Sequence, residues 1–90
     1  MDISLAKSLA SHGAIAGFNV YNDRDGVIND WFFHVLPTGD RHPDDSGVPF
    51  STARGQLKRY KSLDSLMRDV FAIIEADEAR FSLPIHVHYS

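Results

Sequence analysis

The stretch SLDSLMRDVFAII, residues 62–74, decides the fold class of this chain. Its apolar side chains recur at the spacing i, i+3, i+4, i+7 and i+8, which is the pattern of one buried helix face. Ser62 precedes the run as an N-cap, and Asp64 lies in the first turn, where a carboxylate complements the helix dipole. The pattern predicts an amphipathic helix from Leu63 to about Ala79.

Three strands are predicted on the N-terminal side of this helix. Residues 14–22 and 27–36 flank the sequence NDRDG at 22–26, a typical hairpin turn that ends in glycine. Residues 54–61 read as a third, mostly polar strand. The run WFF at 31–33 places aromatic side chains on both faces of the second strand. One of these faces needs further cover, and a homodimer or a protein partner would supply it.

The two ends of the chain complete the element order α-β-β-β-α-β. A short helix is predicted between Asp2 as N-cap and Gly13 as the residue after the C-cap, and residues 85–89 form a closing strand. This order predicts an α+β fold with one antiparallel sheet and both helices packed on one of its faces. We expect a single domain over residues 1–90, with a long irregular loop at 37–53.

Composition excludes several classes of function. The absence of cysteine excludes a disulfide scaffold, a cysteine-ligated zinc site and a thiol nucleophile. The net charge of −3 is opposite in sign to that of a general nucleic-acid binder. No secretory signal and no apolar run of membrane-spanning length is present, so we expect a cytoplasmic protein without membrane contact.

The strongest local charge signal is the stretch 54–68, which holds five of the nine basic residues. A polar strand of this kind could equally be a sheet edge protected by lysine and arginine. We predict that it contacts another protein; the alternative is a nucleic-acid-binding module in which an aromatic ring stacks on a base. The predicted binding residues are Arg54, Lys58, Arg59, Tyr60 and Lys61 of the third strand, with Trp31 of the second strand and Arg41 and His42 of the long loop.

Histidine spacing offers a second alternative, a metal-binding protein. His86 and His88 share one face of the closing strand, and imidazole is a ligand for zinc, copper or nickel. A third ligand could come from His34 or from the long loop, but this spacing occurs freely on strand faces. We therefore expect no metal site and no cofactor. Because no catalytic constellation is evident either, we expect that the protein is not an enzyme.

Residues 57–89 resemble small accessory proteins carried by phages, plasmids and integrative elements. The resemblance rests on a short strand, then the sequence KSLD at 61–64 opening an amphipathic helix, then the closing IHVH at 85–88. Some small anti-CRISPR inhibitors are similar in size, acidity and mixed α/β build. The resemblance carries over no functional residue, but it implies binding or inhibition rather than catalysis. The leading prediction is a small non-enzymatic protein that acts through protein–protein contact, as a mobile-element accessory or inhibitor.

Overall fold

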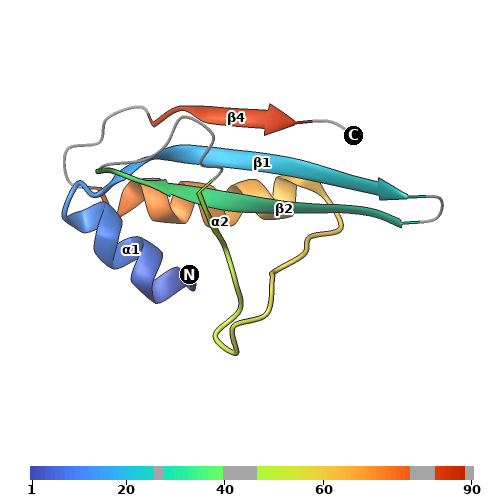
Figure 1. Cartoon of the computed structure of the whole chain (residues 1–90), viewed down its shortest axis with the longest axis horizontal. Helices are drawn as coiled ribbons and strands as arrows, with labels where there is room; N and C mark the ends of the chain where they lie inside the picture. Colours follow the sequence, from blue (N-terminus) through green and yellow to red (C-terminus); the bar gives the residue numbers. More distant parts are fainter. Residues whose placement is uncertain (26–27, 40–46, 78–82, 89–90) are drawn as a thin grey trace.

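The chain folds into a four-stranded mixed sheet and two helices (Figure 1). The computed structural model describes residues 1–25, 28–39, 47–77 and 83–88. The elements in chain order are α1 (Ile3–Ser11), β1 (Ile15–Asp25), β2 (Ile28–Pro37), β3 (Val48–Pro49), α2 (Leu63–Glu75) and β4 (Ile85–His88). This order confirms the predicted α+β class and the predicted sequence of elements.

The strands lie in the order β3-β2-β1-β4. The long β1–β2 hairpin is antiparallel, as is the short β2–β3 pair, but β4 runs parallel to β1. The expectation of a wholly antiparallel sheet is therefore wrong at β4. The reason is the connection from β3 through α2 to β4, because a helical crossover brings the chain back to the sheet in its original direction.

The third strand lies elsewhere than the sequence predicted. It is Val48–Pro49, inside the stretch 37–53 that was expected to be irregular. The stretch 54–61 contributes only isolated bridges, which pair Tyr60 with Trp31 and Leu57 with Ser51. A tight turn, closed by a 2.9 Å hydrogen bond from the Gly55 amide to the Thr52 carbonyl, interrupts regular pairing at this point. The middle of the predicted loop, residues 40–46, is outside the described residues.

One face of the sheet forms the core with both helices. Phe18 and Val20 of β1 and Phe33 and Val35 of β2 are fully buried on this face. The helices contribute small and branched residues to the same cluster, namely Ala6 and Ala10 of α1 and Leu66, Val70 and Ile73 of α2. Phe50, from the segment after β3, stacks on Phe33 with ring centroids 4.5 Å apart. The sheet therefore has one covered face.

The helix ends follow the predicted capping. The Asp2 carboxylate accepts a 2.9 Å hydrogen bond from the Leu5 amide, and the Ser62 hydroxyl accepts one of 3.2 Å from the Ser65 amide. Gly13 follows α1 with a φ of 67°, a conformation that glycine adopts without steric cost. Helix α2 ends at Glu75, four residues before the predicted end, and residues 78–82 are outside the described part of the chain.

The β1–β2 hairpin is longer than the sequence predicted. Strand β1 continues to Asp25, through the stretch that was predicted to turn. The Asn22 side chain donates a 2.8 Å hydrogen bond to the Asn29 side chain on β2, which joins the two strands at this end. The strands run side by side along the long axis of the molecule (Figure 1). Residues 26–27, which connect them, are outside the described residues.

Candidate binding surface

The face of the sheet that points away from the helices carries aromatic and histidine side chains. We call it the open face. Because side chains alternate along a strand, Tyr21 and Phe32 point away from the core that their neighbours Val20 and Phe33 fill. All of its central side chains are partly or fully exposed, namely those of Asn19, Tyr21, Phe32, His34, His86 and His88. The predicted two-faced character of β2 is therefore confirmed, with Phe32 on the second face.

Four flat groups form a row across the open face. Tyr21 lies between Phe32 and His88, with ring centroids 5.2 and 4.9 Å away and planes inclined by 19° and 15°. The Arg59 guanidinium continues the row, 5.7 Å from the centroid of Phe32. His34 packs obliquely on Tyr21 at 4.9 Å. Each ring turns a face toward its neighbour, so the row presents mainly ring edges to solvent.

Three basic side chains of the predicted binding set are paired with aspartates. Within the described residues, Lys58 contacts Asp69 of α2 at 3.0 Å. Arg59 contacts Asp23 of β1 at 2.8 Å. Lys61 contacts Asp30 of β2 at 3.1 Å. Three of the five basic residues in the stretch 54–68 therefore have an aspartate partner that offsets their charge.

Tyr60 belongs to the core, so its ring is not exposed on the surface where the predicted binding residues were expected. Its side chain is 6% exposed, and its hydroxyl donates a 2.5 Å hydrogen bond to the Asp69 carboxylate. Burial, with the hydrogen bond to Asp69 and the charge of that carboxylate, raises the pKa of Tyr60 well above its ordinary value. Burial alone would raise the pKa of Asp69, but the hydrogen bonds from Tyr60 and Lys58 lower it.

The remaining predicted binding residues are scattered. Trp31 is half-buried and packs against the core, and its backbone exchanges two 2.8 Å hydrogen bonds with Tyr60. Arg54 is exposed in the turn before Gly55. Arg41 and His42 lie outside the described residues. Of the predicted residues that the structure describes, Arg59 alone joins the row of flat groups.

His86 and His88 share the open face, as the strand alternation predicted. His88 stacks on Tyr21, and its Nε2 lies 3.2 Å from the side-chain oxygen of Asn19. Among the described residues, no group of three or more histidine, aspartate or glutamate side chains could hold a metal ion. His88 instead serves the row as one of its flat rings.

Tyr21, the centre of the row, was not among the predicted binding residues. The signal was present, because Phe18 and Val20 alternate with Asn19 and Tyr21 along β1. The hairpin then sets Tyr21 directly opposite Phe32. An alternating strand beside a strand that is aromatic on both faces therefore places two aromatic rings together on the outer face.

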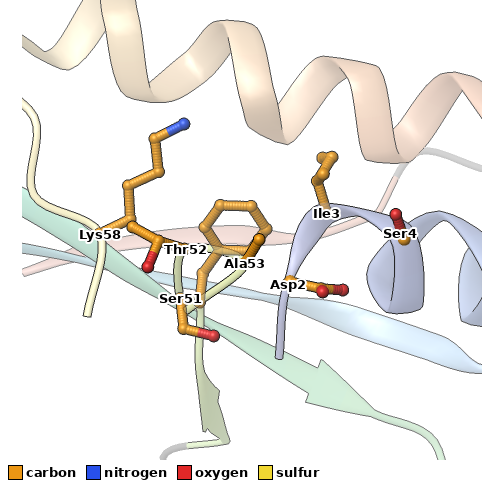
Figure 2. Close-up of a pocket in the computed structure, with 8 residues that line it drawn as sticks. Asp2, Ile3, Ser4, Ser51, Thr52, Ala53 and Lys58 are labelled. Carbon is orange, nitrogen blue, oxygen red and sulfur yellow. The ribbon is translucent and has the colours of Figure 1, made fainter. Parts of the chain in front are cut away.

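A small pocket lies between the start of α1 and the segment after β3 (Figure 2). Its volume is about 210 Å³, and it is lined in part by Ile3, Phe50 and Lys58. The Lys58 side chain points toward α2, where it pairs with Asp69, and the Asp2 carboxylate caps α1. The charged groups of this pocket are therefore engaged within the protein.

Comparisons with protein-family models, with curated proteins and with solved structures find no match to this chain. The resemblance of residues 57–89 to mobile-element accessory proteins therefore stays a prediction. None of the helices in the described part of the chain is long and apolar enough to cross a membrane.

Proposed function

We propose that this chain is a non-enzymatic binding protein that docks another protein on its open face. The observation that carries the proposal is the row of His88, Tyr21 and Phe32, which lies half-exposed on the face opposite the helices. Aromatic side chains and arginine are enriched in the centres of protein interfaces. A rigid row of this kind loses little conformational entropy when a partner covers it.

Electrostatics favours a protein partner over a nucleic acid. Phosphate binding depends on lysines and arginines whose charge is available to the backbone of the nucleic acid. Here Lys58, Arg59 and Lys61 are already paired with aspartates. Base stacking also needs an open ring face, whereas Tyr21 and Phe32 each lie between two flat neighbours of the row.

The partner surface follows from the chemistry of the open face. The centre of the face is aromatic, with Tyr21 and Phe32 beside polar histidine side chains, while the Arg59–Asp23 ion pair forms a charged rim beside Phe32. Such a face suits a partner that presents apolar groups to the two aromatic rings, hydrogen-bonding groups to the histidines and little net charge. Inhibition, in which this chain covers a surface that its partner needs, is the form of binding that the resemblance of residues 57–89 implies.

Capture from the native host with matched phenylalanine variants tests the proposal. Phe32→Ala removes a ring from the row, and Phe71→Ala removes an equally large ring that is 53% exposed on α2. We expect Phe32→Ala to weaken the affinity for the captured partner about 30-fold, as expected for a central interface residue. Phe71→Ala should retain the wild-type affinity.

Titration with the purified partner supplies these affinities, and thermal melting confirms that both variants are folded. Equal loss of binding in the two variants would contradict the assignment of the open face. So would a captured partner that binds Phe32→Ala as tightly as the wild type.

A further inference from the structure

The two edges of the sheet differ in how they are protected against pairing with another strand. Strand β3 forms one edge, is only two residues long and ends in Pro49, which has no amide hydrogen to donate. Strand β4 forms the other edge with four residues that include no lysine, arginine, acid or proline. Within the described residues, β4 pairs with β1 alone. One edge is therefore protected, and the other offers a template for strand addition.

The backbone groups of β4 that point outward can be assigned. The Phe18 amide donates a 3.0 Å hydrogen bond to the carbonyl of Pro84, so the backbone of Pro84 faces β1. Alternate residues of a parallel strand face the same neighbour, so those of His86 and His88 also face β1. The amides and carbonyls of Ile85 and Val87 then point away from the sheet.

We propose that β4 pairs antiparallel with β4 of a second copy of this chain, about a two-fold axis at His86. In this register Ile85 lies opposite Val87 of the second copy, and Val87 lies opposite its Ile85. The outward amides and carbonyls of both strands exchange hydrogen bonds, as in a regular antiparallel pair. The two sheets join into one, and the open faces of the two copies lie side by side.

Pairing with a second copy places a stricter demand on β4 than pairing with a foreign strand, and the sequence of β4 meets that demand. A two-fold axis at His86 places His86 opposite its own copy and places Ile85 and Val87 opposite each other, so charges of one sign at these positions would repel. The strand Ile85–His88 contains no lysine, arginine or acidic residue. On the helix side the register sets Ile85 against Val87, which is 38% exposed in the single chain. On the open face His86 meets His86 of the second copy.

This inference is independent of the proposed function, because it concerns the edge of the sheet rather than its open face. Sedimentation equilibrium of the purified chain over a range of concentrations measures the oligomeric state. We expect a reversible monomer–dimer equilibrium. A chain that stays monomeric at every concentration up to about 1 mM overturns the proposal. This limit is about a thousandfold above a micromolar dissociation constant.

Two variants of Val87 test the outward backbone groups. Val87→Pro removes the outward amide and leaves the bonds from β4 to β1 in place, whereas Val87→Ala keeps the amide and shortens the side chain. Because the two-fold axis doubles each loss, we expect Val87→Pro to weaken dimerisation at least about tenfold. Val87→Ala should remain within about threefold of the wild type. Equal effects of the two variants overturn the backbone pairing.

Charge at His86 tests the two-fold axis itself. His86→Lys and His86→Glu each place like charges opposite one another, and each should weaken self-association about fivefold. The two variants mixed in equal amounts place opposite charges together and should form a heterodimer at least as stable as the wild-type dimer. Unchanged self-association in both variants, or a mixture that does not recover dimer, places the contact elsewhere and overturns the proposal. Circular dichroism confirms that each variant is folded.

Discussion

At the scale of single residues, Asp69 joins the segment before α2 to the helix itself. Its carboxylate accepts hydrogen bonds from the Tyr60 hydroxyl and from Lys58. These bonds lower its pKa although burial alone would raise it. A carboxyl group with a lower pKa in the folded state stabilises the fold above its unfolded pKa, and this contribution disappears as the pH falls through the folded pKa. The ordinary value of Asp69 is 3.8, so the loss begins near that pH.

We therefore expect Asp69→Asn to lower the free energy of unfolding at pH 7 by about 1–3 kcal/mol, since a buried tyrosine hydroxyl loses its charged acceptor. The difference from the wild type should shrink as the pH drops below 3.8. Urea unfolding at pH 7 and at pH 3 measures this. Asp64→Asn is the matched control, because Asp64 is an exposed acid in the first turn of α2 and should lose only the helix-dipole contribution of about 0.3–1 kcal/mol. A loss of equal size at both pH values would mean that the charge of Asp69 contributes nothing.

At the scale of elements, the helices were predictable because their signals are local. The caps Asp2 and Ser62 bond to amides three residues further along the chain. The third strand was not predictable, because a polar edge strand and an ordered loop have similar composition in the stretch 54–61. The direction of β4 was also hidden, because strand alternation is the same whether the neighbouring strand is parallel or antiparallel.

The position of β4 depends on Gly17 of β1. A Cβ atom at this position would lie 2.8 Å from the carbonyl oxygen of Pro84, a distance that requires the backbone to move. We expect Gly17→Ala to destabilise the fold by about 1–3 kcal/mol through this overpacking. Hydrogen exchange should show faster exchange at the amides of Phe18, His86 and His88. The amides of α2 are the internal control, and a uniform change across α2 and β4 would contradict a local displacement.

At the scale of the whole molecule, the pairing of charged side chains could not be predicted from the sequence. The sequence places a basic stretch at 54–68 and several aspartates far from it. The fold brings Asp23 to Arg59 across 36 positions and Asp30 to Lys61 across 31 positions. The candidate binding surface is consequently the open face rather than the basic stretch. Arg59 belongs to the basic stretch and also to the row of flat groups on the open face.

Single-stranded DNA binding tests this neutralisation. Arg59 is held by Asp23 at 2.8 Å, so we expect no binding of the wild-type chain to a labelled oligonucleotide at physiological salt. Asp23→Asn removes the nearer of the two aspartate partners of Arg59 and leaves Asp30 at 3.9 Å. It should produce weak binding at low salt, with log K falling by about 0.7 per tenfold rise in salt for one phosphate contact. Asp64→Asn changes the net charge equally on α2 and should not produce it. Fluorescence anisotropy over a salt series measures both variants. Tight, steeply salt-dependent binding by the wild-type chain would instead identify a nucleic-acid-binding module. It would mean that the basic residues of the stretch 54–68 remain available to phosphates despite their aspartate partners.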